Sequence, residues 1–147
     1  MDLVHFHKIA NKCYALKIII LPKLIEVLIF LIYNSRIPSS VKIGKKTRFA
    51  YWGIGVVIHK DSSIGANCTI GQGITIGGRG KRIGVPHIGN NVFIGAGARI
   101  LGPIKICDNS IIAPNAVVIK DVQKNTVVAG IPAKVIRDNI LDVEDFL

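Results

Sequence analysis

The stretch VVIHKDSSIGANCTIGQGITIG, residues 56–77, decides the fold of this chain. Isoleucine recurs in it at every sixth position, and glycine follows three of these four isoleucines. The same spacing extends along the chain in both directions, with two longer steps. The anchor positions that follow it are Ile37, Ile43, Phe49, Ile58, Ile64, Ile70, Ile76, Ile88, Ile94, Ile100, Ile106, Ile112 and Val118.

A period of six excludes the commonest arrangements of secondary structure. An α-helix cannot keep such a period on one side, and an antiparallel meander needs turn clusters between its strands. A chain that turns a corner after every hexad satisfies the pattern, with three hexads making one triangular coil of about eighteen residues. The sequence therefore predicts a hexapeptide β-helix whose anchors fill the interior. We expect the glycine after each anchor to relieve backbone strain at the corner.

Two excursions interrupt the repeat. Three extra residues bulge out around residues 51–55, and six extra residues leave the prism around residues 78–86. A regular coil needs neither insertion, and loops on a rigid scaffold commonly hold functional sites. The two excursions are therefore the first places to look for function.

Composition limits the possible partners. The chain has 147 residues, half of them apolar, and a net charge of +10. That length suits one domain with an added cap. The positive field favours an anionic partner, such as nucleic acid, a phosphate-bearing cofactor or an acidic membrane surface. Few aromatic residues lie among the lysines, which argues against a dedicated nucleic-acid reader. An ordinary solvated surface explains many of these lysines equally well.

The three cysteines predict neither a metal site nor a redox motif. Cys13, Cys68 and Cys107 are far apart, and no C-x-x-C spacing occurs. Cys68 falls at an inward position of the repeat, where a small core residue is expected. Free cysteines of this kind suit the reducing cytoplasm.

Residues 1–36 differ from the repeat because they lack glycine and are rich in Leu, Ile and Lys. We predict two short helices, broken near Pro22, that cap the open end of the prism and help subunits to associate. Peripheral contact with a membrane is the alternative, since the segment is both basic and apolar. Its longest apolar run, residues 27–33, is too short to span a bilayer. No small-residue cleavage site follows, which disfavours a signal peptide.

Two of the four histidines are candidate catalytic residues. His59 occupies a corner position where other coils have glycine, so it should project outward beneath Gly77, next to both excursions. His87 closes the second excursion. Each of them also fits an ordinary corner or loop residue. His5 and His7, in the helical segment, are expected to be structural or exposed. His59 and His87 each stand alone, without a partner at a spacing such as H-x-x-x-x-H, so no metal site is predicted.

Three segments resemble the serine acetyltransferase-like branch of the hexapeptide acyltransferases. They are GVVIHKDSSIGANCTIGQGITIGGRG, PHIGNNVFIGAGARILGPIKI and VVAGIPAKVI. The resemblance covers residues 37–137 and implies a left-handed parallel β-helix, a homotrimer with active sites between subunits, and acetyl-CoA as co-substrate. Within the branch, the chain looks most like short O-acetyltransferases of sugars and surface polysaccharides. The implied location is the cytoplasm or the inner face of the membrane. An acidic carboxyl-terminal tail, residues 138–147, follows the region of resemblance.

The resemblance implies a histidine base that activates an acceptor hydroxyl for direct attack on the thioester. The family's histidine precedes the G-V-V-I run, where this chain has Tyr51 and Trp52, and neither is a competent base at neutral pH. We therefore predict His59 as the base, with His87 orienting the acceptor or sharing the role. Tyr51 and Trp52 would shape the acceptor pocket, or simply cover a hydrophobic face.

The resemblance also implies which residues bind acetyl-CoA. Corner backbone would hold the pantetheine arm, and nearby cations would meet the phosphates. The matching residues are Gly77, Gly78, Arg79, Ala96, Gly97, Lys120, Lys134 and Arg137.

Two other functions stay open. One is a serine O-acetyltransferase of cysteine biosynthesis, although the histidine of the bulge and the long helical amino-terminal domain of that enzyme are missing from this sequence. The other is a β-helix that binds or scaffolds without catalysis, which the Tyr51–Trp52 departure favours.

Overall fold

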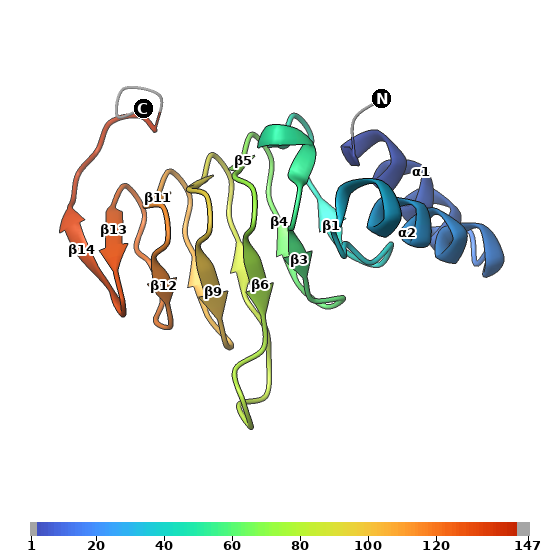
Figure 1. The fold of residues 1–147 in the computed structure, drawn as a ribbon. Helices are drawn as coiled ribbons and strands as arrows, with labels where there is room; N and C mark the ends of the chain where they lie inside the picture. The colour runs from blue at the N-terminus through green and yellow to red at the C-terminus, as the bar shows by residue number, and fades with distance from the viewer. Residues whose placement is uncertain (1–2, 144–147) are drawn as a thin grey trace.

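Two helices and a triangular β-prism lie end to end in the molecule (Figure 1). The computed structural model describes residues 3–143. Helices α1 (Leu3–Ala15) and α2 (Ile20–Tyr33) come first and lie at the amino-terminal end of the prism. Neither of these helices has the length and hydropathy that crossing a bilayer requires.

Short strands form the three walls of the prism, each named here after its first strand. The β1 sheet contains β1 (Lys42–Ile43), β4 (Ser63–Ile64), β7 (His87–Ile88) and β10 (Lys105–Ile106). The β2 sheet contains β2 (Arg48–Phe49), β5 (Thr69–Ile70), β8 (Phe93–Ile94), β11 (Ile111–Ile112), β13 (Val127–Gly130) and β14 (Ala133–Arg137). The β3 sheet contains β3 (Val57–Ile58), β6 (Thr75–Gly77), β9 (Arg99–Leu101) and β12 (Val117–Val118).

The strand pairing confirms the predicted β-helix. Pairs within the prism are parallel, and each anchor pairs with the anchor one coil away, as Ile58 does with Ile76 and Ile70 with Ile94. The inward side chains are buried, with Ile70 and Ile76 both 0% exposed. Burying one such side chain contributes about 1.5–3 kcal/mol relative to leaving it in water.

Both excursions leave this register undisturbed. The bulge contains a short 3-10 turn, η1 (Ala50–Gly53), between β2 and β3. The loop of residues 78–86 joins β6 to β7 and projects beyond the ends of the neighbouring coils (Figure 1). Since Ile64 still pairs with Ile88, the extra residues lie entirely outside the prism.

The corner glycines have a different role from the one predicted. Gly65 does not adopt the left-handed conformation. A Cβ atom there would lie 2.3 Å from the carbonyl oxygen of Gly89, so glycine is required because successive coils touch backbone to backbone. The left-handed residues come two positions later, at Asn67 (φ +56°) and Asn91 (φ +51°). Asparagine tolerates that region better than most residues.

Polar side chains join the helices to the first coil. His7 Nε2 lies 3.1 Å from the carbonyl oxygen of Pro38, and Asn11 Nδ2 donates to the carbonyl oxygen of Ser39 at 2.7 Å. The N–H of Ser39 donates to Oε1 of Glu26 at 2.7 Å. Burial lowers the pKa of His7 below 6.5, against the smaller opposing effects of the Pro38 hydrogen bond and of Glu26.

Three predictions about individual segments are confirmed. The helices break at residues 16–19, and Pro22 lies in the first turn of α2, where its missing N–H removes no helical bond. His7 is structural, at 1% exposed, whereas His5 is exposed. Cys68 is a core residue at 0% exposed, and burial raises the pKa of its thiol above 9.0.

The carboxyl end of the prism finishes with a reversal of strand direction. β14 pairs antiparallel with β13, whereas the other pairs of that sheet are parallel. Beyond it, Ile140 and Val143 are buried against Ile111 and Val127. The predicted acidic tail therefore begins with a packed segment, and its residues 144–147 lie outside the described part of the chain.

Gly65→Ala should destabilise the prism because the added methyl group would overlap the next coil. We expect a loss of about 2–3 kcal/mol in the free energy of unfolding, measured by urea denaturation. Gly78→Ala is the matched control, since a Cβ atom there meets no atom within 4 Å. Equal losses in the two variants would rule out close contact as the reason for Gly65.

The protein should lose stability as the pH falls below the ordinary range of histidine. The folded-state pKa of His7 lies below its unfolded value of 6.5, so the unfolded chain binds the proton more readily. The contribution of neutral His7 is therefore present above pH 6.5 and lost as the pH falls below it. His7→Gln keeps a donor for Pro38 but cannot titrate. Urea denaturation of this variant should show a flatter pH dependence; an unchanged slope would assign the effect to other groups.

Candidate active site

One corner of the prism holds both candidate histidines. Residues 59–62 connect β3 to β4 at this corner, and the loop of residues 78–86 leaves it one coil further on. The N–H of His59 donates to the carbonyl oxygen of Ile76 at 2.8 Å, which places His59 beneath Gly77 as predicted. A shallow groove of about 330 Å³ lies here. Its lining includes Arg36, Val57, His59, Lys60, Thr75 and Gly77.

The ring of His59 is engaged by its own turn. The N–H of Asp61 donates to His59 Nδ1 at 3.3 Å, and a carboxylate oxygen of Asp61 lies 3.7 Å from the same nitrogen. A neutral imidazole has one nitrogen that accepts and one that donates. When Nδ1 accepts the N–H of Asp61, a neutral ring has its proton on Nε2. In this arrangement His59 has no free lone pair for an acceptor hydroxyl.

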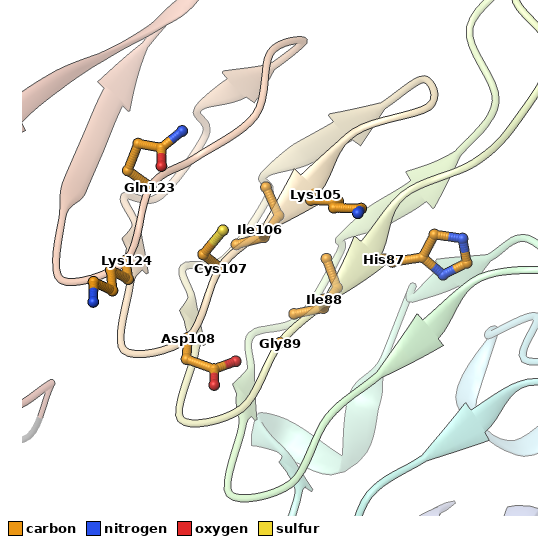
Figure 2. A pocket seen from close by; sticks show the side chains of 9 residues that line it. All are labelled: His87, Ile88, Gly89, Lys105, Ile106, Cys107, Asp108, Gln123 and Lys124. Atoms are coloured by element: carbon orange, nitrogen blue, oxygen red, sulfur yellow. The ribbon is translucent and has the colours of Figure 1, made fainter.

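His87 has a more suitable arrangement for proton transfer. It extends from β7 at one end of a groove of about 510 Å³, and Gln123 and Lys124 lie at the other end (Figure 2). Its Nδ1 lies 2.9 Å from Ser63 Oγ, and Nε2 makes no hydrogen bond to the described residues. When Nδ1–H donates to Ser63, Nε2 is left as an unprotonated base.

Ser63 is not among the residues that the sequence predicts. It pairs with His87 across the parallel β4 and β7 strands. Counting coils through the inserted loop places Ser63 next to His87, because Ile64 and Ile88 are anchors of successive coils on the same wall. This count could have predicted from the sequence that Ser63 lies beside His87.

The bulge lies away from His59. Tyr51 and Trp52 have φ values of +47° and +59° and are 75% and 70% exposed. Such backbone angles are strained for bulky side chains. The bulge is bound to the end of helix α2 through Gly55, whose N–H donates to the carbonyl oxygen of Tyr33 at 3.2 Å. It precedes β3, whereas His59 follows it, so the expectation that His59 borders both excursions holds only for the loop.

The predicted cofactor residues divide between two corners. Gly77 and Gly78 lie at the loop corner, where β6 ends, whereas Ala96 and Gly97 precede β9 at the opposite edge of the β3 sheet. A Cβ atom at Gly78 would meet no atom within 4 Å. Glycine at position 97 is needed for structural reasons, because its φ is +73° and a Cβ atom would lie 2.1 Å from the Asn115 amide oxygen. Within one protomer these residues do not form a single track.

The predicted phosphate-binding cations are also dispersed. Arg79 lies in the loop and packs near Gly102, since a Cβ atom on that glycine would lie 3.4 Å from the Arg79 Cβ. Lys120 follows β12, and Lys134 and Arg137 lie on the final strand β14 (Figure 1). Within residues 3–143, no group of three or more His, Cys, Asp or Glu side chains is arranged to hold a metal ion.

Comparison with known proteins assigns the repeat to a family. The profile described as "Bacterial transferase hexapeptide (six repeats)" matches residues 86–120, and "Hexapeptide repeat of succinyl-transferase" matches residues 55–79. The serine acetyltransferase of Staphylococcus epidermidis is 42% identical over 133 residues, which are 89% of this chain and 62% of that protein. That of Synechococcus elongatus is 38% identical over 132 residues, 88% of this chain and 54% of that protein.

The hexapeptide repeats of this chain are similar to those of the hexapeptide-repeat acyltransferases. Solved serine acetyltransferases share the fold of this chain, so the predicted left-handed parallel β-helix is confirmed. Brucella abortus serine acetyltransferase in complex with coenzyme A superimposes with a TM-score of 0.87 at 31% identity, covering 92% of this chain and 55% of that one. Soybean serine acetyltransferase complexed with serine gives a TM-score of 0.85 at 33% identity, covering 91% and 56%.

These hexapeptide-repeat relatives favour a different acceptor from the main sequence-based prediction. Each of them is named for serine, and none for a sugar or polysaccharide. The predicted similarity to sugar O-acetyltransferases therefore gains no support, whereas the serine alternative does. The chain spans less than two thirds of the length of these relatives.

Proposed function

We propose that this chain is an acetyl-CoA-dependent O-acetyltransferase, with serine as the acceptor that its relatives favour. The observation that supports it most is the open backbone at Gly77 and Gly78, beside the loop. A Cβ atom at Gly78 would meet nothing, and one at Gly77 only a Thr75 methyl group at 4.0 Å. No packing requirement explains glycine there, and the Brucella enzyme of the same fold was solved with coenzyme A. A pantetheine arm would lie against this backbone.

The site is completed by a second subunit, and the assembly is a homotrimer. The carboxyl ends of the β3-sheet strands provide Gly77, Gly78 and the loop. The amino ends of the same strands provide Ala96 and the aromatic bulge. A groove between two copies brings these opposite ends together, which one copy alone cannot do. Arg79, Lys120, Lys134 and Arg137 are the cations assigned to the CoA phosphates.

His87 is the general base in this proposal, in preference to His59. When Nδ1–H of His87 donates to Ser63, its Nε2 can accept the hydroxyl proton, whereas a His59 ring that accepts the N–H of Asp61 at Nδ1 has no second lone pair. The activated oxygen attacks the thioester carbonyl carbon, the C–S bond breaks, and protonated His87 returns the proton to the departing CoA thiolate. A backbone N–H group of the loop corner would stabilise the oxyanion.

Tyr51 and Trp52 would line the acceptor side of the composite site. They stand at the family's histidine position and are largely exposed in the single protomer. An aromatic wall would also accept a sugar ring, so sugars remain the second class of acceptor to assay. Cytoplasmic location and the absence of a nucleic-acid partner stay predictions from the sequence.

Thiol release from acetyl-CoA is the direct test of the reaction. We expect turnover with serine above that with sugars or with no acceptor. A preference for sugars would restore the first sequence-based prediction. No release with any acceptor, together with retained CoA binding, would leave the non-catalytic β-helix as the function.

Variants of the two histidines test the choice of base in the same assay. His87→Ala should lower kcat by about 10²–10⁴-fold with CoA affinity nearly unchanged, and His59→Ala should have a much smaller effect. Ser63→Ala should shift the pH profile of kcat, and Ser63→Thr should preserve it because the hydroxyl is retained. Loss of activity in His59→Ala with full activity in His87→Ala would reverse the assignment.

Mixing two inactive variants tests whether the site lies between subunits. His87→Ala removes the loop-corner half, and Ala96→Trp obstructs the other half. After denaturation and refolding together in equal amounts, about one quarter of the interfaces in a random trimer combine two intact halves. Activity should return to that fraction, and light scattering should give the mass of a trimer. A mixture as inactive as its components would contradict a shared site.

A further inference from the structure

Helix α2 is apolar on its outward side as well as on its inward side. Pro22, Ile25, Ile29 and Tyr33 form its buried stripe. On the opposite side lie large aliphatic side chains that the described chain leaves exposed: Ile20 at 81%, Leu24 at 55%, Val27 at 52% and Leu31 at 71%. A helix that is apolar all round is normally buried, in protein or in lipid.

Few charged groups lie on α2. Its only charged residues are Lys23 and Glu26, and Glu26 turns toward the first coil to accept the N–H of Ser39. The segment just before α2 extends the exposed apolar surface, with Leu16 at 66% and Ile19 at 72% exposed. The result is one continuous apolar surface at the amino-terminal end of the prism.

A basic cavity adjoins this apolar surface. It has a volume of about 740 Å³ and lies between the helix junction and the first coil. Four cations line it, namely Lys17, Lys23, Arg36 and Lys60, and the exposed Ile18 and Ile19 stand among them. The one carboxylate in the lining is Glu26, which is bonded to Ser39. Positive charge therefore exceeds negative charge in the cavity.

We propose that the helical cap binds peripherally to an anionic lipid bilayer. Leu16, Ile19, Ile20 and the outward side of α2 would enter the boundary between headgroups and acyl chains, and the basic cavity would receive a lipid phosphate. With 14 residues, α2 would lie along the surface, as interfacial amphipathic segments do. Two signals, apolar insertion and positive charge, are together sufficient for stable attachment.

Charge favours lipid over a second copy of the chain as the occupant. A two-fold contact between α2 helices would bring Lys17 and Lys23 of both copies to the same interface. The nearby carboxylate of Glu26 is already bonded within its own subunit. Anionic headgroups would instead neutralise these lysines. The inference does not depend on acetyl transfer.

Vesicle co-sedimentation with the full chain tests the proposal. We expect binding to vesicles of phosphatidylcholine mixed with phosphatidylglycerol, weak binding to pure phosphatidylcholine, and release when salt rises from about 0.1 M to about 1 M. The double variant Lys17→Glu and Lys23→Glu should bind more than about tenfold more weakly, because each lysine contributes about fivefold. Ile20→Asp with Leu31→Asp should weaken binding at least as much.

Matched controls lie at the far end of the prism. Lys124→Glu and Leu141→Asp change an exposed lysine and a side chain that is 93% exposed, and they should bind vesicles like the parent protein. Equal losses in the controls, or no binding to anionic vesicles, would overturn the proposal. So would displacement from the vesicles by soluble glycerol 3-phosphate, which offers the phosphate without acyl chains. If Ile20→Asp with Leu31→Asp instead lowers the mass in light scattering and vesicles are not bound, a second copy covers α2.

Discussion

Backbone contact between successive coils is the constraint on which the structure depends. At Gly65 the distance to the next coil leaves no room for a methyl group, so this corner can approach the next coil only because it has no side chain. Once this approach is possible, strands of two residues pair with both neighbours, and the anchors stack into a dry interior. Local strand propensity is minor here, because such short strands would not be stable alone.

Left-handed corner residues add a second line of support along the same edge. Asn91 Nδ2 donates to the Asn109 amide oxygen at 2.9 Å, and Asn109 Nδ2 donates to that of Asn125 at 2.8 Å. The backbone geometry that favours asparagine at one corner therefore also places its amide beside the next. Each coil is fixed mainly by its nearest neighbours, as expected for a solenoid.

The sequence predicted the coils well because a period of six determines which side chains point inward. Ile58 pairs with Ile76 and Cys68 is buried, as the spacing requires. The sequence predicted the role of the corner glycines wrongly. Backbone strain and close approach of two coils both favour glycine, and only the three-dimensional structure distinguishes the two causes. The site was harder because hydrogen bonds on the outer surface do not follow the repeat. Asp61 beside His59 and Ser63 beside His87 each contact Nδ1 of the ring, and the repeat predicts neither hydrogen bond.

The proposed site also illustrates a limit set by a triangular prism. Residues close in sequence, such as the bulge and His59, are separated by the width of a wall. Residues on different coils of one corner become neighbours instead. In the proposed trimer, a single protomer would therefore provide two half-sites at opposite ends of the β3-sheet strands. Activity would then depend on how the copies are arranged around the trimer axis.

The reversed strand β14 has a consequence for solubility at the other end of the molecule. An open parallel sheet would offer its unpaired N–H and C=O groups to the first coil of another molecule, and prisms would join head to tail into filaments. β14 runs in the opposite direction, pairs irregularly near Val127, and places Lys134 and Arg137 along the outermost edge. Charged edge residues and irregular pairing are the means by which natural sheets avoid such growth. The helices over the first coil and β14 on the β2 sheet therefore disfavour such growth at both ends of the described prism.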